Sequence, residues 1–212
     1  MNAVNESALF ASRDFAGAFA LLAEMTQNFA QSRDIEATLE HALGKIVAHL
    51  DGVVGSLWLV EEEDQELVCR ASVGSHPITG KRLPVSQGVI GRSVRQNCCE
   101  TVLDVQNDPE FARVVDDESG FVTRSLVCAP LSFSDRPLGA IQVVNKRSED
   151  GCFSESDIHL LRVLASAAAL AIANARMAVA AVEHVRVHRE LELAAEFLRT
   201  LLPVPRPRPF PI

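Results

Sequence analysis

The sequence has no tyrosine, only one tryptophan, and fewer basic residues than acidic ones, 20 against 28. The resulting net charge of −8 argues against a protein that binds nucleic-acid phosphates. No run of 18 apolar residues is free of charged or polar interruptions, and the first residues lack the basic and apolar stretches of a signal peptide. We therefore expect a cytoplasmic protein with neither a nucleic-acid partner nor a membrane partner.

The five cysteines are an odd number, and they lack both the C-x-x-C spacing and a Cys/His spacing typical of metal sites. We predict no metal site. The adjacent pair Cys98 and Cys99 is interpreted as ordinary reduced thiols, with a redox switch as the less favoured alternative.

Proline and glycine are absent from Ser154 to Leu202, which predicts one helix of roughly 70 Å. Its residues fit a heptad frame, which indicates a coiled coil and favours a parallel homodimer. The a positions are Leu160, Ala167, Asn174, Ala181, His188, Ala195 and Leu202, and the d positions are Val163, Leu170, Met177, His184, Leu191 and Leu198.

Three of these seam positions are polar. Asn174 either fixes the register or leaves two registers close in energy. His184 and His188 either stay solvated at the edge of a loose seam or form a pH-sensitive or metal site from two chains. Their spacing lacks the glutamate of a zinc-protease helix, so we do not expect a peptidase.

The whole chain is 48% hydrophobic, which is enough for a sizeable core, and its length suits one domain with extensions. Apolar periodicity predicts helices over 15–30 and 34–50, and Ser86 is expected to introduce a short helix up to residue 97. Strands are predicted over 55–63, 66–74, 81–86 and 100–105, and the clearest hairpin joins 125–133 to 137–145. Residues 107–121 are polar and acidic, which is typical of a loop that covers a site.

The segment after this hairpin has a local explanation. Phe153, Ser154, Asp157 and Ile158 form the pattern of a capping box with a hydrophobic staple. Capping does not explain Asn145 and Lys146 at the strand end, where the lysine can reach Asp157 across the loop.

The run Asn145-Lys146, Phe153 and Asp157 resembles the signature of GAF domains in cyclic-nucleotide phosphodiesterases and cyclases, although Ile158 stands in place of the usual glutamate. VDDESGFVTRSLVCAPL, residues 115–131, resembles a second run of that family. The resemblance implies an α+β fold: a GAF-like antiparallel sheet of about six strands flanked by helices, followed here by the long C-terminal helix. It implies a lid salt bridge between Lys146 and Asp157. The ligand-binding positions that it implies are Ser56, Ser72, Val73, Val89, Ile90, Ser119, Thr123 and Gln142.

The sequence departs from the family's cyclic-guanosine binders at two places, because Ser72-Val73 replaces Phe-Asp and Gln142 replaces a glutamate. HRELELAAEFLRTLLPVPRP, residues 188–207, resembles the junction before the catalytic domain of bacterial metal-dependent serine phosphatases. We expect an N-terminal tail over 1–14, a GAF domain over 15–180, a coiled-coil signalling helix over 181–202 and a proline-rich linker over 203–212.

The resemblance implies a non-enzymatic sensor that dimerises through its N- and C-terminal helices. It would bind a small molecule, with a cyclic nucleotide as the candidate, and control a C-terminal output domain, expected to be a serine/threonine phosphatase. The main alternative is a ligand-free dimerisation module. A redox enzyme that reduces methionine sulfoxide is a further alternative, disfavoured by the spacing of the cysteines. A bilin photoreceptor is disfavoured by the absence of tyrosine and of a Cys-His pair.

Overall fold

The computed structural model describes residues 34–61 and 65–201, together with 17, 19–21, 23–25 and 27–29. The described residues between 17 and 29 are helical, as predicted. The N-terminal tail expected over 1–14 and the proline-rich linker expected over 203–212 lie outside the described residues.

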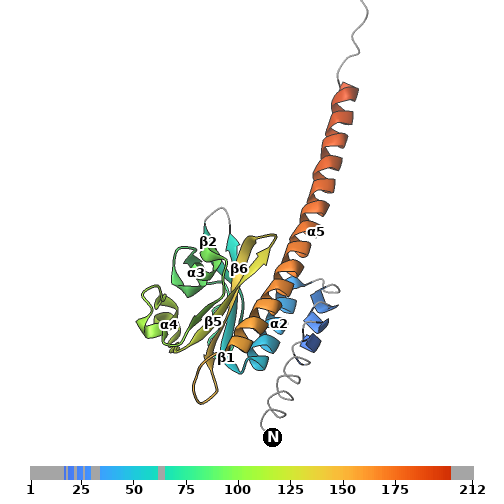
Figure 1. The fold of residues 1–212 in the computed structure, drawn as a ribbon. Coiled ribbons are helices and arrows are strands. Elements are labelled where there is room, and N and C mark those ends of the chain that lie inside the picture. Colours follow the sequence, from blue (N-terminus) through green and yellow to red (C-terminus); the bar gives the residue numbers. More distant parts are fainter. Residues whose placement is uncertain are drawn as a thin grey trace, which may run out of the picture. The chain divides into compact units, whose positions relative to one another are not determined.

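Six strands form one antiparallel sheet in the order β3-β2-β1-β6-β5-β4 (Figure 1). The predicted fold class is confirmed. The strands are β1 (Gly52–Glu61), β2 (Glu66–Val73), β3 (Arg82–Pro84), β4 (Glu100–Val102), β5 (Leu126–Phe133) and β6 (Arg136–Lys146).

Helices cover both faces of this sheet (Figure 1). Helix α2 (Ile35–His49) and the first half of α5 (Glu155–Leu201) pack on one face, which we call the helix face. Helix α3 (Gly88–Gln96), the 3₁₀ turn η1 (Val105–Asn107) and α4 (Val114–Ser119) lie on the other, which we call the pocket face.

The alternation of side chains along the central strands explains why these strands are apolar throughout. In β1, Leu57 and Leu59 belong to the core of the helix face, whereas Trp58 belongs to the core of the pocket face. In β6, Ile141 and Val143 alternate in the same way with residues of the pocket face. A strand that is covered on both sides needs apolar residues at nearly every position.

Helix α2 begins as its local sequence predicts, whereas α3 does not. The Asp34 side chain accepts a hydrogen bond from the Ala37 backbone N–H at 3.1 Å and caps α2. Ser86, which we expected to introduce α3, is not its N-cap. That position is held by Gln87, which makes no side-chain capping bond, because the chain turns into the helix at Gly88 with φ of +76°.

Residues 1–173 and 174–212 form two separate compact units, and α5 begins in the first and continues in the second. In the first unit, α5 buries Leu161, Leu164 and Ile172. In the second, the described side chains from residue 176 onward are all exposed.

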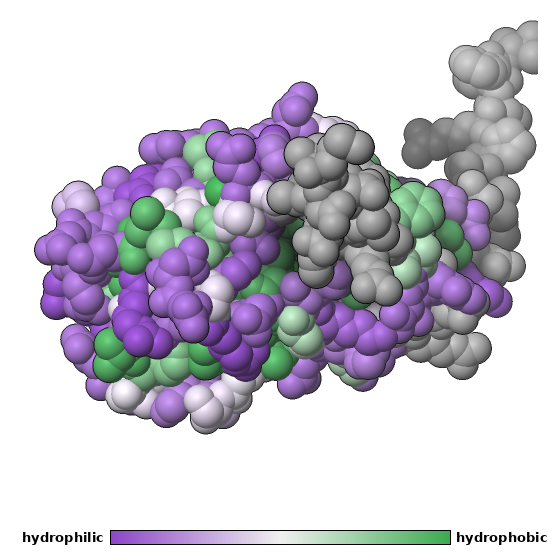
Figure 2. All heavy atoms as spheres, turned by 60° about the horizontal axis from the view of Figure 1, so that its bottom comes forward, coloured by the Kyte–Doolittle hydropathy of each residue, from purple (hydrophilic) through white to green (hydrophobic). Residues whose placement is uncertain are grey.

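The stretch Glu155–Ala194 is long and apolar enough to cross a membrane, by length and composition only. Core helices of soluble proteins meet the same criterion, and the first part of this stretch lies in the core. Over the described residues, the face of the molecule shown in Figure 2 is mainly hydrophilic, with hydrophobic residues in separate patches.

Candidate functional site

A polar row crosses the pocket face at its centre. In the strand register, Ser56 of β1 lies opposite Ser72 of β2 and Gln142 of β6, and Gln142 lies opposite Cys128 of β5. Directly opposite residues in antiparallel strands point to the same face of the sheet. These four side chains therefore lie among the apolar residues of the pocket face.

Two small cavities, of about 50 and about 40 Å³, lie beside Gln142 of this row, and residues of α4 line both of them. Both are lined by Val115, Asp116, Thr123, Gln142 and Val144. The first also contacts Val89 and Ile90 at the start of α3, and the second contacts Ser56, Val73, His76 and Ser119. The structure thus brings seven of the eight predicted ligand-binding positions together around one region.

The eighth position, Ser72, lines neither cavity. Its hydroxyl lies 2.8 Å from the Thr79 hydroxyl and accepts a hydrogen bond from the Ile78 backbone N–H at 3.1 Å. Ser72 therefore holds the loop after β2 in place. Ser56 is also engaged, because its hydroxyl accepts a 2.8 Å hydrogen bond from the Trp58 indole N–H.

Gln142 differs from these serines. Its side chain lines both cavities, and the part of the chain that the structure describes offers its amide no hydrogen-bond partner. A primary amide has two donor hydrogens and an acceptor oxygen. Gln142 is therefore the polar group of the pocket that is best placed to bind a ligand or an ordered water.

Asp116, which the sequence analysis did not single out, closes the pocket from the α4 side. Its two carboxylate oxygens accept hydrogen bonds from the Thr123 backbone N–H and the Thr123 hydroxyl, each at 2.7 Å. These bonds tie α4 to the segment that enters β5. The residue lies in the run 115–131 that carried the family resemblance, so a signal for it was present in the sequence.

Asn145 fixes that same segment from the other side. Its side-chain carbonyl accepts hydrogen bonds from the backbone N–H groups of Arg124 (2.7 Å) and Ser125 (3.2 Å), and its NH₂ group donates to the Val122 carbonyl at 2.8 Å. Asn145 is buried and has φ of +55°, a conformation that asparagine tolerates better than most residues. It therefore clamps the backbone on both sides of Thr123.

Lys146 and Asp157 form an ion pair between the end of β6 and the first turn of α5. Both side chains are only 15% exposed, and the Lys146 ammonium lies 5.5 Å from the centre of the Phe153 ring. The capping box is present as well, because Ser154 and Asp157 exchange backbone-to-side-chain hydrogen bonds of 2.7 and 3.2 Å. Asp157 therefore both caps α5 and pairs with Lys146.

A second charged cluster holds the chain between α3 and α4, and no local sequence pattern predicts it. The Arg92 guanidinium donates two hydrogen bonds to Asp108, at 3.0 and 3.1 Å, and lies 3.1 Å from Glu100. These bonds lower the pKa of the Asp108 carboxyl and raise the pKa of Arg92. Sixteen residues separate Arg92 from Asp108, and nothing in the local sequence pairs them.

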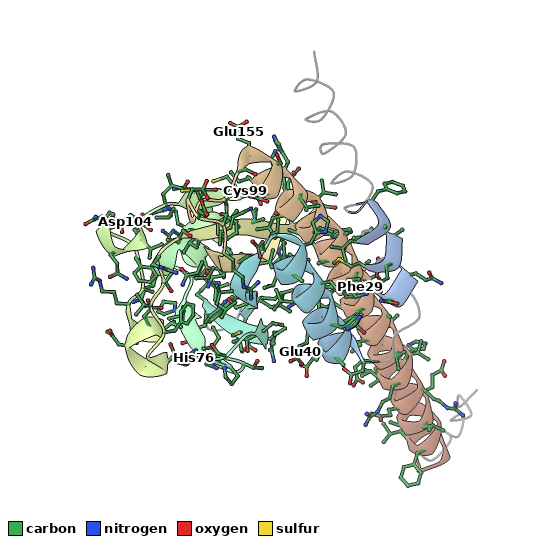
Figure 3. The ribbon with its side chains drawn as sticks, turned by 90° about the horizontal axis from the view of Figure 1, so that it is seen from below. Phe29, Glu40, His76, Cys99, Asp104 and Glu155 are labelled. Carbon is green, nitrogen blue, oxygen red and sulfur yellow. The ribbon has the colours of Figure 1, made fainter. Side chains whose placement is uncertain are left out.

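His76 was also missed. Figure 3 shows this side chain beside the α4 segment, and its ring centre lies 5.6 Å from that of Phe121. It lines the second cavity, where it contributes the only imidazole among the described lining residues.

The cysteines are free thiols. Burial raises the pKa of Cys69 and of Cys128 to about 12, and burial together with Glu100 raises the pKa of Cys98. The thiolate is the reactive form of cysteine, so these raised pKa values argue against a redox role. Within a single copy of the described chain, no group of three or more His, Cys, Asp or Glu side chains could hold a metal ion.

The fold has counterparts among known proteins. The profile of one domain family, described as the GAF domain, matches residues 32–173. A dual 3',5'-cyclic-AMP and -GMP phosphodiesterase 11A from Takifugu rubripes is 30% identical over 97 residues, which is 45% of this chain and 11% of that protein. The match thus spans only a small part of that relative.

Two solved structures show the same fold at low sequence identity. The GAF domain of a phosphoenolpyruvate-protein phosphotransferase from Coxiella burnetii has a TM-score of 0.69 at 21% identity, covering 78% of this chain and 98% of that one. Free methionine-R-sulfoxide reductase from Neisseria meningitidis, in complex with its substrate, has a TM-score of 0.63 at 21% identity, covering 76% and 91%.

Proposed function

The chain belongs to the GAF domain family, and from this premise we propose that it is a dimeric sensor module. A small molecule bound beneath α4 would regulate an output domain attached after α5. GAF domains occur in signalling proteins and also in enzymes, so the family alone does not decide between a sensor and a catalyst. The choice between a sensor and a catalyst therefore depends on the residues of the site.

The observation that carries the proposal is the Gln142 amide, which lines both cavities and has no hydrogen-bond partner among the residues that the structure describes. The Gln142 side chain is partly exposed, and no fully buried side-chain N or O atom of the described residues lacks a hydrogen-bond partner, so water can reach this amide. A ligand that hydrogen-bonds the amide would replace this water, and a hydrogen bond of this kind contributes a net of about 0.5–1.5 kcal/mol. A cyclic nucleotide is the candidate ligand, because the residues around the cavity occupy positions that resemble those of nucleotide-binding GAF domains.

A continuous set of hydrogen bonds supports a route from this pocket to α5. Asp116 binds Thr123, Asn145 clamps the backbone beside Thr123, and the next residue, Lys146, pairs with Asp157 in the first turn of α5. A ligand that displaces Asp116 changes the first link of this set. Ligand binding can regulate an output domain only if the ligand binds one of two arrangements of the sensor more tightly than the other. In this proposal, the Asp116–Thr123 hydrogen bonds are formed in one arrangement and broken in the other.

The small size of the cavities supports a closed arrangement, in which α4 lies against the sheet before a ligand binds. Cavities of about 50 and 40 Å³ hold a few water molecules each, whereas ligand pockets usually measure roughly 300–1,000 Å³. Nucleotide binding therefore requires α4 to move away from the sheet. The same volumes favour the second candidate function, a ligand-free module that only dimerises.

Native mass spectrometry of the purified chain, alone and with cyclic AMP or cyclic GMP, separates the two functions. We expect a dimer that binds one nucleotide per subunit, and we expect Gln142→Leu to remove this binding while leaving the dimer intact. Gln96→Leu, at an exposed position outside both cavities, is the matched control. A dimer that ignores both nucleotides would favour the ligand-free module.

The nature of the output domain rests on the sequence alone. Residues 188–207 resemble the junction that precedes a serine phosphatase domain, so we propose such a domain as the regulated partner. The reductase alternative is weaker, because the raised pKa values of Cys69, Cys98 and Cys128 keep their thiols protonated near neutral pH.

A further inference from the structure

The second unit of the chain presents two histidines at successive positions of a single exposed helix face. His184 and His188 occupy neighbouring d and a positions of the heptad frame, and both side chains are exposed. The other d positions described on α5 are apolar and about half exposed or more: Val163 49%, Leu170 48%, Met177 52%, Leu191 64% and Leu198 57%. The histidines thus interrupt an apolar stripe that the described residues of one chain leave largely exposed.

A second copy of the chain is the occupant that fits this stripe. A partner helix must carry apolar residues with the same 3.5-residue period, over the same length, as α5. The α5 helix of a second copy meets this requirement because its sequence is identical. In a parallel, in-register pair, every a residue meets its own copy, so Asn174 lies opposite Asn174. A polar a-position asparagine is the residue type that fixes such a register.

The same pairing gathers four imidazoles. Four residues advance the helix by about 6 Å and return to nearly the same face, so His184 and His188 can both reach one point beside the helix. The partner helix supplies the same two side chains from the opposite side of the seam. Neutral imidazole is a preferred ligand of zinc and of related transition-metal ions, and four ligands complete a tetrahedral zinc site.

The surroundings of the pair suit a bound cation. The Glu192 carboxylate lies 3.4 Å from His188 Nε2, four residues further along the helix. A carboxylate beside a ligating histidine orients the ring and supplies negative charge. Val185 and Val187, at the flanking e and g positions, are apolar and exposed, and in a dimer they would shield the histidine layers from water.

We propose that the paired α5 helices bind one divalent transition-metal ion, with zinc as the test ion, between His184 and His188 of two copies of the chain. The inference rests on the proposed homodimer. Within one copy, the described residues provide no group of three potential ligands, so the site exists only when two chains meet. Metal binding would therefore favour the dimer over the monomer.

Sedimentation of the full chain across a concentration series, with zinc chloride or with EDTA, tests this site. We expect one zinc ion per dimer and a dimer dissociation constant at least about tenfold lower with zinc. The variant carrying His184→Leu and His188→Leu should lose zinc binding but dimerise at least as tightly in EDTA, because leucine restores the apolar seam. His159→Ala is the control, since His159 is exposed on α5 and has no histidine four residues away.

The outcomes separate the metal site from the dimer. A dimer that shows no zinc-dependent tightening, or a double variant that still binds zinc, would overturn the metal site and leave the proposed dimer intact. A chain that remains monomeric in zinc and in EDTA would overturn both.

Discussion

The two faces of the sheet are built differently, although the same strands form both. The helix face packs two long helices, α2 and α5, against apolar residues that include Leu57, Ile141 and Val143. The pocket face has an apolar cluster too, but a polar row crosses it and two cavities remain. Its helices are short, and hydrogen bonds and ion pairs hold them in place.

This difference indicates a division of tasks. Apolar packing is non-directional and strong in sum, so the helix face is suited to hold the domain together. Polar contacts can be exchanged for contacts with a ligand or with water at low net cost, so the pocket face is suited to rearrange. Three measurements test whether the two faces differ in this way.

We expect the greatest decrease in the free energy of unfolding when packing on the helix face is removed. Leu164 is 0% exposed, and Leu164→Ala should lower the free energy of unfolding by roughly 3–5 kcal/mol, measured by urea denaturation. Leu126, 2% exposed, lines the first cavity on the pocket face, and Leu126→Ala should cost only about 2 kcal/mol, since water or a shift of α4 can fill the space.

Leu103→Ala, at a position 61% exposed, serves as the control and should change stability by less than about 0.5 kcal/mol. Equal losses for Leu164→Ala and Leu126→Ala would contradict the comparison, because they would mean that both faces are packed equally tightly.

We expect a smaller decrease in the free energy of unfolding when the Lys146–Asp157 pair, which joins the end of the sheet to α5, is broken. We expect Lys146→Ala and Asp157→Ala each to cost about 1–3 kcal/mol in urea denaturation, and the double variant to cost less than their sum. Asp157→Asn separates the two roles of Asp157, because the amide keeps an acceptor for the Ser154 N–H but loses the charge that Lys146 binds.

If the two single losses simply add, the ion pair contributes nothing beyond the helix cap. In that case the hydrogen-bonded route from the pocket to α5 would end at Asn145, and the proposed coupling would lack its last link.

Much of the fold follows from local sequence. The hairpin predicted over 125–133 and 137–145 is observed as β5 and β6 within a few residues, because two long apolar runs joined by a short polar turn have few alternatives. The capping box at Ser154 and Asp157 is equally local. The unbroken stretch without proline or glycine predicted α5 almost to its last residue.

The site was less predictable, because it depends on contacts between distant residues. Ser72 has the residue type and strand position of a ligand contact, but Thr79 and Ile78 engage its hydroxyl. Arg92 finds Asp108 and Glu100 only through the fold. The cavity volumes depend on how closely α4 approaches the sheet, which no local pattern encodes.

The smallest expected effect is a pH dependence on the pocket face. The Arg92 guanidinium lowers the pKa of the Asp108 carboxyl in the folded chain, and their side chains are 15% and 10% exposed. A lowered folded pKa stabilises the protein above the unfolded pKa of about 3.9, and this contribution is lost as the pH falls through the folded pKa. Asp108→Asn should therefore cost about 1–2 kcal/mol at pH 5–7, and the gap between variant and parent should close below about pH 4.

Urea denaturation of both proteins between pH 3 and pH 7 measures this gap, with Asp117→Asn as the control at an exposed aspartate in α4. A gap that stays constant down to pH 3 would mean that Asp108 stabilises the loop by hydrogen-bond geometry alone. A gap that closes with acid would show that ionic contacts hold the pocket face together.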